Sequence, residues 1–408
     1  MPARTGRDLI WSGEIARDRM SARASAFHPY AFLLATWALN VCDNAFYIAP
    51  APVFQPMVRD LGISNAQAGA LISVFLLAIL LFQIPAGYLI DRRDPRPIIL
   101  VSSASVVLVS LAIWLFPRYE LMLPLRFLAG IPLAFIFVPC AYLVSKAFAD
   151  APGRSVGLFL SGPPTGVALG SLLGPAIGQA FGWPAVYVAF TLPILVLLPL
   201  FAFFVRSFPT YPRETFTLPQ YLVAFRNLEL WKVGAIFACS YAAYIFYSSW
   251  SPTFLEANGI RDVALLGILS SAIPAAGIFS RPVGGYLAEA RFSHDKRVVP
   301  LAAFALLAGT SVALPFLGLG AIPLLIAGGF LAQIPFTVYY LFSAQILPPR
   351  FAGTAYAFMN TVSLIGGAVS PGLAGYLLDV TGTFFAPFAM IALTALLGLL
   401  LVLWTRER

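Results

Sequence analysis

Long apolar stretches follow one another along almost the whole chain, and they restrict the fold more than any other feature. An apolar run of about 18 or more residues is long enough to cross a bilayer as an α-helix. By this criterion we predict about twelve membrane-spanning helices, at 30–57, 66–90, 97–116, 121–147, 154–180, 184–205, 232–254, 263–288, 298–318, 321–346, 353–379 and 384–404. Only 10% of the 408 residues are charged, against about 25% in a soluble domain. The chain therefore lacks the surface of a soluble protein, and its short loops leave no room for a catalytic domain.

The distribution of Lys and Arg predicts how the chain is threaded through the lipid bilayer. An even number of spans places both termini on one side. The only basic residues in the loops on the other side are Arg59, Arg118 and Arg261. Because cytoplasmic loops carry the excess of basic residues, we predict a multi-pass protein of the cell (inner) membrane with both termini in the cytoplasm. The net charge of +8 is then a feature of topology, and no binding to nucleic acid is expected.

A pentapeptide is repeated at half-chain distance. The sequence GYLID at 87–91 returns as GYLAE at 285–289, each time between a long apolar stretch and a basic loop. Two homologous membrane halves with a cavity between them are the usual build of a carrier. We therefore predict a basic cytoplasmic tail at 1–27, a six-helix bundle at 28–205, a cytoplasmic linker at 206–231 and a second six-helix bundle at 232–405.

Three short motifs resemble those of the major facilitator superfamily. GYLIDR at 87–92 looks like the start of its signature between spans two and three, and Arg96 falls near the later basic position. RFLAG at 126–130 is similar to its Arg-x-x-x-Gly element in span four, and GSLLGPAIG at 170–178 to its Gly-Pro element in span five. The resemblance covers 28–405 and implies an all-α membrane protein with 12 transmembrane helices in two pseudo-symmetric six-helix bundles.

The resemblance also implies a conformational gate. In the family, the position of Asp91 locks the two halves in the outward-open state; alternatively, Asp91 and its basic neighbours mark only a solvated helix end. Glycine at every fourth position from Gly162 to Gly178 leaves one helix face without side chains, which suits either a rocking contact between the halves or ordinary tight packing. The predicted gate residues are Gly87, Asp91, Arg92, Arg96, Gly285, Glu289, Gly174 and Pro175.

One carboxylate is predicted near the middle of the membrane. Asp43 lies about 22–24 Å along the helix from the nearest charged flanks, and Asn40, Asn44 and Tyr47 surround it in the same span. A charged group at this depth costs about 2.5–3.5 kcal/mol or more, so it is a functional candidate. Desolvation disfavours the charged carboxylate, which would let Asp43 load and release a proton. The alternatives are a fixed buried ion pair or a hydrogen bond between packed helices.

Two arginines also fall inside predicted spans. Arg281 lies about 12 Å inside the cytoplasmic end of its span, and its planar fork of donors suits a carboxylate or nitrate. The run SRPVGG at 280–285 resembles the same span of nitrate/nitrite, oxalate and cyanate-type anion porters. Nitrate porters carry a second arginine where this chain has Gln83, so a small organic monoanion fits better than nitrate. For Arg126 the family element implies a part in proton transfer. Snorkelling of the charged end to the membrane surface is the alternative for both arginines.

Hydroxyl, amide and aromatic side chains in several spans complete the predicted cavity. They suit a small polar solute with an apolar body, although an aromatic stripe alone is typical of packing. The predicted substrate-binding residues are Arg281, Gln83, Asn40, Asn44, Tyr47, Tyr241, Tyr244, Gln333, Tyr339 and Asn360. The predicted proton-coupling residues are Asp43 and Arg126.

These features predict a secondary carrier rather than an enzyme. The carrier would move a small organic or inorganic anion by alternating access, driven by protons or by exchange for a counter-anion, and we expect a monomer. The sequence has no Gly-x-x-x-x-Gly-Lys-Ser/Thr phosphate loop and no metal-ligand spacing of His and Cys, so no cofactor or metal is expected. Two alternatives remain open: a proton-driven exporter of small amphiphilic or drug-like compounds, and a carrier-like sensor or scaffold that transports nothing and docks through its tail.

Overall fold

The described part of the molecule is built from helices. The computed structural model describes residues 28–90, 92–148, 152–206, 224–348 and 352–405, and contains no strand within these ranges. The predicted tail, Asp91 of the predicted gate and most of the predicted linker lie outside the described residues. Eleven of the described helices are long and apolar enough to cross a membrane, which agrees with an all-α membrane protein.

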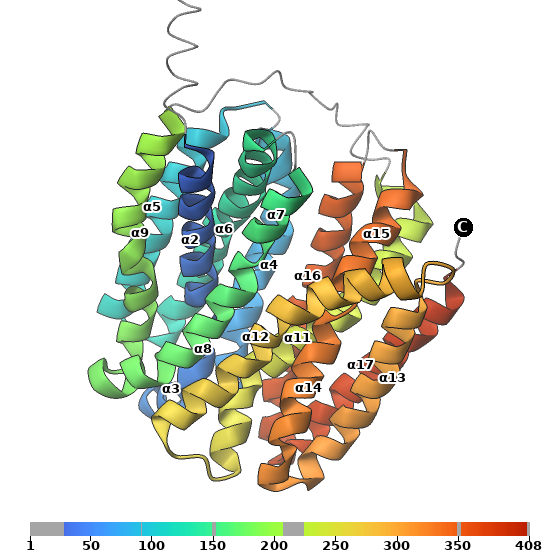
Figure 1. The fold of residues 1–408 in the computed structure, drawn as a ribbon. Coiled ribbons are helices and arrows are strands. Elements are labelled where there is room, and N and C mark those ends of the chain that lie inside the picture. The colour runs from blue at the N-terminus through green and yellow to red at the C-terminus, as the bar shows by residue number, and fades with distance from the viewer. Residues whose placement is uncertain (1–27, 91, 149–151, 207–223, 349–351, 406–408) are drawn as a thin grey trace, which may run out of the picture.

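The helices form two groups that follow the two halves of the chain (Figure 1). The first half contains α2 Pro29–Ile48, η1 Ala51–Val53, α3 Phe54–Leu61, α4 Asn65–Ile90, α5 Pro95–Leu115, α6 Tyr119–Ala147, α7 Pro152–Leu160, α8 Gly162–Phe181 and α9 Trp183–Arg206. The second half contains α11 Leu228–Ala257, α12 Val263–Tyr286, η2 Leu287–Arg291, α13 Val298–Ala313, η3 Leu314–Phe316, η4 Gly318–Ala321, α14 Ile322–Gln333, α15 Phe336–Ile346, α16 Ala352–Thr381 and α17 Phe385–Trp404.

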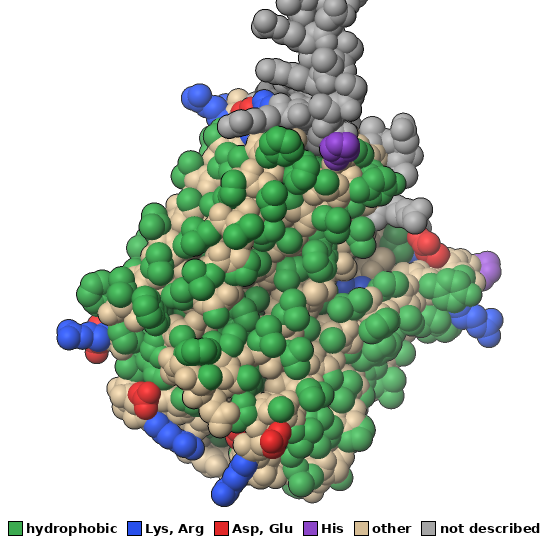
Figure 2. Space-filling model, turned by 60° about the vertical axis from the view of Figure 1, so that its left-hand side comes forward, with side chains coloured by type: hydrophobic (Ala, Val, Ile, Leu, Met, Phe, Trp, Pro, Cys, Tyr) green, Lys and Arg blue, Asp and Glu red, His purple; other side chains and the backbone are tan. Residues whose placement is uncertain are grey.

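The outer surface is apolar, as a bilayer requires. Large side chains such as Leu34, Val101 and Leu400 are more than half exposed. Figure 2 shows hydrophobic side chains across the middle of one face, with most of the charged side chains toward its edges. Such a surface would be costly in water but is compatible with lipid, because helices satisfy their backbone hydrogen bonds internally.

Three predicted spans are broken rather than continuous. The first is interrupted between α2 and α3, the fifth at Ser161 between α7 and α8, and the tenth at 334–335 between α14 and α15. Proline, which has no N–H to donate and disturbs the preceding turn, lies at or next to each break, at Pro50, Pro163 and Pro335. The break at Ser161 is held against α2, since Trp37 Nε1 donates to Ser161 Oγ at 3.0 Å.

The predicted fifth span is not among the eleven helices that are long and apolar enough to cross a membrane, because glycine and proline lower the hydropathy of α8.

The glycine stripe of α8 packs mainly inside its own half. A Cβ atom at Gly166 or Gly170 would meet α2, and one at Gly174 would meet Pro52 of η1. These glycines therefore provide tight packing within the first bundle, and the expected rocking contact between the halves is not made by this face. The two halves approach each other elsewhere, where α4 packs on α16 and α8 on α12. A Cβ atom at Gly69 would meet the carbonyl of Pro371, and one at Gly267 the carbonyl of Leu172.

The halves are fastened together at the end of the bundle that holds the start of α4 and the end of α16. We call this the Asn65 end. Asp379 of α16 accepts hydrogen bonds from the backbone N–H of Asn65 at 3.0 Å, from its side-chain Nδ2 at 2.8 Å and from the N–H of Ala66 at 2.8 Å. Ser73 of α4 accepts from the N–H of Gly372 at 3.1 Å. One carboxylate thus caps the N-terminus of a helix in the other half.

The opposite end, at the start of α2 and the end of α17, holds the predicted gate residues Gly87, Arg92, Arg96, Gly285 and Glu289, whereas Gly174 and Pro175 lie in the second half of α8. Arg92 and Glu289 are exposed there, and the guanidinium of Arg92 lies 4.0 Å from the ring centre of Tyr88 in its own half. Apart from the neighbouring backbone of its own helix, no described atom lies within 4 Å of a Cβ atom built at Gly87, and Gly285 packs on Thr337 of its own half. The gating role of these residues therefore stays a prediction.

The half-chain repeat continues in three dimensions beyond the pentapeptide. Arg96 pairs with Asp94 at 2.6 Å, and the N–H of Arg96 also donates to Asp94 at the start of α5. In the second half, Arg297 pairs with Asp295 at 2.9 Å and donates its N–H in the same way. Each basic loop therefore carries an Asp-x-Arg clamp, which assigns the predicted gate residue Arg96 a local role at the start of a helix.

Candidate functional site

A cavity of about 130 Å³ lies between the halves and is lined by helices from both of them. Eight of the ten predicted substrate-binding residues line it, together with Asp43: they are Arg281, Gln83, Asn40, Asn44, Tyr47, Tyr241, Tyr244 and Asn360. Apolar side chains such as Leu76, Phe137 and Phe336 fill the spaces between the polar groups. The cavity is smaller than the roughly 300–1,000 Å³ typical of sites for drug-sized ligands.

The first half contributes a polar cluster centred on Asp43. Asp43 is 1% exposed, Asn40 3% and Gln83 5%. Among the described residues, neither carboxylate oxygen of Asp43 has a hydrogen-bond partner, and Gln83 Oε1 has none either. Asn44 Nδ2 donates to Asn40 Oδ1 at 2.8 Å. This bond occupies the oxygen of the Asn40 amide and leaves its Nδ2 without a partner. Within the described residues, Asp43 therefore forms neither the fixed ion pair nor the packing hydrogen bond of the alternative expectation.

The second half contributes a cation held between aromatic rings. Arg281 Nη2 donates to Gln333 Oε1 at 3.0 Å, and the guanidinium lies 4.9 Å from the ring centre of Phe336 and 5.9 Å from that of Tyr244. Arg281 Nε has no hydrogen-bond partner in the described part of the chain. The side chain lines the cavity between the halves, so the snorkelling alternative for Arg281 is wrong.

Two predicted ligands lie behind the cavity wall. Gln333 is fully buried and donates Nε2 to the carbonyl of Gly329 at 3.1 Å, so its role is to position Arg281. Tyr339 is also fully buried, and its hydroxyl bonds to Ser240 at 2.7 Å. Its neighbour Tyr340 lines the cavity instead and donates to Asn360 Oδ1 at 3.3 Å. Phe336 and Tyr340 lie four residues apart on α15 and both line the cavity.

Arg126 is enclosed within the first bundle and does not line the cavity. It is 0% exposed, which excludes the snorkelling alternative. Its guanidinium donates to the carbonyl of Leu71 at 3.0 Å, to that of Phe46 at 3.1 Å and to that of Tyr47 at 2.6 Å. The last two carbonyls belong to the final turn of α2, where Pro50 cannot donate an N–H back to Phe46. Arg126 therefore caps the negative end of a broken helix, and its part in proton transfer stays a prediction.

Substitution of Arg126 with methionine should lower the thermal stability of the protein by several degrees. The apolar side chain fills similar space but removes the donors that Arg126 supplies to the carbonyls of Tyr47 and Phe46, and leaves Phe46 only the 3.3 Å bond from the N–H of Ala49. A buried group that loses its donor costs about 1–3 kcal/mol. Thermal unfolding in detergent measures the effect, and Arg118→Met at an exposed position is the matched control. Equal unfolding temperatures for the two variants would contradict the capping role.

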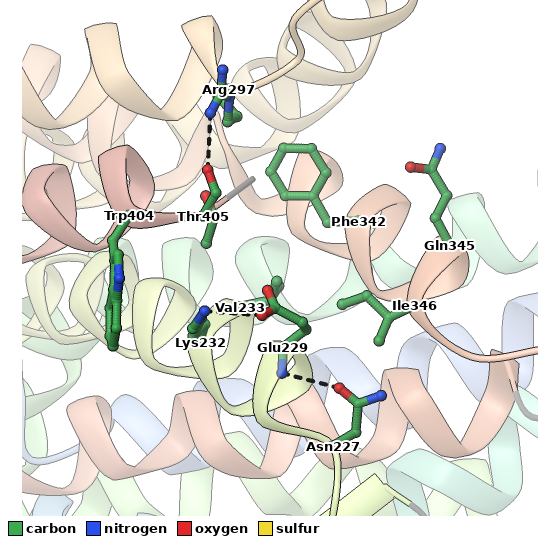
Figure 3. A pocket seen from close by; sticks show the side chains of 10 residues that line it. All are labelled: Asn227, Glu229, Lys232, Val233, Arg297, Phe342, Gln345, Ile346, Trp404 and Thr405. Atoms are coloured by element: carbon green, nitrogen blue, oxygen red, sulfur yellow. Dashed lines mark hydrogen bonds and ion pairs between the residues drawn. The ribbon is translucent and has the colours of Figure 1, made fainter. Parts of the chain in front are cut away.

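A second cavity, of about 510 Å³, lies within the second half between α11, α13, α15 and α17 (Figure 3). Its charged groups are already paired: Lys232 bonds to Glu229 at 2.9 Å, and Arg297 donates to the carbonyl of Thr405 at 2.9 Å. Although it is larger, this cavity does not lie between the halves. The smaller cavity, where neither Asp43 nor Arg281 forms an ion pair with a described residue, is therefore the candidate functional site.

Comparison with known proteins identifies the family of the chain. The family model described as Major Facilitator Superfamily matches residues 36–371. A hexuronate transporter of Bacillus subtilis (strain 168) is 24% identical over 88% of this chain and 89% of its own length. A quinolone resistance transporter of Acinetobacter baumannii is 24% identical over 85% of this chain and 86% of its own length. Among solved structures, a bacterial homologue of the human lysosomal transporter Spinster, in an inward-facing and unoccupied conformation, has a TM-score of 0.75 at 16% identity and covers 92% of this chain and 95% of its own.

Proposed function

The chain belongs to the Major Facilitator Superfamily, and from this membership we propose that it is a secondary carrier that moves a small organic anion across the membrane by alternating access. The observation that carries the proposal is the position of Arg281. Its guanidinium lines a cavity between the two halves and retains an unpaired Nε within the described structure.

The environment of Arg281 favours an anionic substrate. Gln333 and the rings of Phe336 and Tyr244 surround the guanidinium, and the described ion pairs do not include Arg281. A cation inside the membrane is costly unless it is compensated, and a carboxylate that accepts two parallel N–H bonds compensates it well. A bound anion would thus supply the counter-charge that Arg281 lacks among the described residues.

Asp43 is the proposed coupling group. It is buried in the same cavity, and its carboxylate has no described hydrogen-bond partner. A proton on Asp43 and an anion on Arg281 would together leave the cavity neutral, which lowers the cost of enclosing it. With the proton and the anion both bound, one half would rock against the other. The end of the bundle that holds the start of α2 would face the cytoplasm.

Alternating access requires contacts that form in one state and break in the other. The hydrogen bonds from Asn65 and Ala66 to Asp379 link the two halves at the Asn65 end. We propose that this end is extracellular and that Asp379 holds it closed in the state described.

The change Asp379→Ala should shift the protein toward the form that is open at the Asn65 end, by about tenfold in the ratio of the two forms, since loss of a helix cap costs about 0.5–2 kcal/mol. Spin labels at the exposed positions 59 and 383 would report the separation of the halves. Asp262→Ala is the matched control, because Asp262 caps α12 within one half. Identical distance distributions in all three proteins would count against the role of Asp379.

An exporter of drug-like compounds is the second candidate, because the quinolone resistance transporter is as similar in sequence as the hexuronate transporter. The aromatic side chains of Tyr241, Tyr244 and Phe336 along the cavity also suit an amphiphile. The small volume and the absence of a described ion-pair partner for Arg281 favour an anion. A non-transporting sensor or scaffold has no need for unpaired buried charges, which are expensive in a membrane.

A thermal-shift panel on the purified protein separates the candidates. The panel contains monocarboxylates, dicarboxylates, nitrate, cyanate and hydrophobic cations, and a bound solute raises the unfolding temperature. Stabilisation by a monocarboxylate, followed by its uptake into proteoliposomes, is the expected result. Stabilisation by hydrophobic cations alone would replace the proposal with the exporter, and no stabilisation by any solute would favour the scaffold.

A further inference from the structure

The candidate cavity is polar at two separate places. Arg281 lies on the wall from the second half, whereas Asn40, Asp43 and Gln83 lie on the wall from the first half. Simple anions such as nitrate or acetate would satisfy Arg281 but leave the polar atoms of the first half without partners. Buried polar groups that stay unpaired are expensive, so these atoms point to a second recognition element on the substrate.

The unpaired atoms of the first half define the chemistry of that element. Within the described residues, Asp43 Oδ1 and Oδ2, Gln83 Oε1 and Asn40 Nδ2 have no hydrogen-bond partner. Gln83 Oε1 accepts and Asn40 Nδ2 donates, and Asp43 with the proposed proton would do both. The bond from Asn44 to Asn40 Oδ1 fixes the orientation of the Asn40 amide. The hydroxyl of Tyr47, which both donates and accepts, is unpaired in the same described set.

We propose that this cluster, Asn40, Asp43, Tyr47 and Gln83, binds hydroxyl groups of the substrate, so that the carrier selects hydroxylated monocarboxylates over plain ones. A hydroxyl group donates and accepts at once, which matches a cluster with both kinds of unpaired atom. An ammonium group only donates and would meet the Nδ2 donor of Asn40 unfavourably. The inference rests on the proposed anion site and specifies which carboxylates that site takes.

Matched solutes test the inference. Dissociation constants are measured on the purified full-length protein for propionate and glycerate, for butyrate, 2-hydroxybutyrate and 4-hydroxybutyrate, and for hexanoate and gluconate. Within at least one pair, the hydroxylated acid should bind about tenfold more tightly, since a site built to hydrogen-bond a hydroxyl discriminates against the analogue that lacks it. The three chain lengths cover different separations between the carboxylate and the hydroxyl.

Variants assign the preference to the cluster. In Gln83→Leu the ratio between plain and hydroxylated acids should fall toward one, and Asn40→Ala provides a second test where Gln83→Leu does not fold. Gln345→Leu, at an exposed position outside this cavity, should keep the wild-type ratio.

Three outcomes separate this inference from the proposed function. Equal binding of plain and hydroxylated acids overturns the hydroxyl cluster and leaves the anion carrier standing. Tighter binding of 4-aminobutyrate than of 4-hydroxybutyrate also overturns it, in favour of a zwitterion. Binding of no carboxylate of either kind overturns the proposed function itself.

Discussion

Replacement of Arg281 with lysine should reduce uptake of the transported anion by about tenfold or more while the protein remains folded. Lysine keeps the positive charge, but its compact ammonium group cannot present the planar fork of N–H donors that a carboxylate accepts in pairs. The loss of one charge-assisted hydrogen bond is worth about 1.5–3 kcal/mol, and each 1.4 kcal/mol changes binding about tenfold. The substitution should also weaken the contact with Gln333, which fixes the guanidinium at 3.0 Å.

Uptake into proteoliposomes measures the effect, with the carboxylate that binds best in the thermal-shift panel as substrate. Arg261→Lys is the matched control, because Arg261 is exposed in the loop before α12 and should transport at the wild-type rate. Thermal unfolding of both variants separates lost binding from lost folding. Wild-type uptake by a folded Arg281→Lys protein would remove Arg281 from the substrate site.

The polar residues of the cavity could be predicted because the membrane makes each of them costly. Asp43, Asn40 and Tyr47 follow helical spacing within one apolar span, so a common face toward a cavity was predictable. The half-chain repeat then aligned Gln83 with Arg281, and both line the cavity. Local sequence is sufficient here, since the environment of the residues is set by the bilayer and by helix geometry.

Residues whose orientation depends on tertiary packing could not be placed in this way. Tyr339 and Tyr340 are neighbours on α15; Tyr340 lines the cavity together with Phe336, whereas the hydroxyl of Tyr339 bonds to Ser240. Residue type alone does not distinguish two adjacent tyrosines, because which face of α15 meets the cavity depends on the helices packed around it. The four-residue spacing of Phe336 and Tyr340 was the available signal, because side chains four residues apart share a helix face.

Arg126 and the glycines of α8 illustrate a second limit. An arginine near a helix end can snorkel or turn inward, and the choice depends on carbonyl groups of other helices. Here the carbonyls of Phe46, Tyr47 and Leu71 supply three acceptors. The glycine stripe likewise predicted a close approach, but only the assembled bundle identifies α2 as the neighbour of Gly166 and Gly170.

The substitution Asp43→Asn should abolish the response of transport to an imposed pH gradient. The amide occupies the space of the carboxyl group and still offers hydrogen bonds, but it cannot bind and release a proton. If the proton on Asp43 is what allows the loaded cavity to be enclosed, the asparagine variant is permanently neutral at this position. Anion exchange down a concentration gradient should therefore continue, whereas accumulation against a gradient, driven by protons, should fall to the level of protein-free liposomes.

The measurement compares uptake of the same carboxylate with and without a pH difference across the proteoliposome membrane. Glu120→Gln is the matched control, because Glu120 is exposed at the start of α6 and its loss should leave the gradient response intact. Retention of the gradient response by Asp43→Asn would exclude Asp43 as the coupling group. In that case anion–anion exchange through Arg281 alone becomes the mechanism to test, because within the described residues no other Asp or Glu lines the cavity.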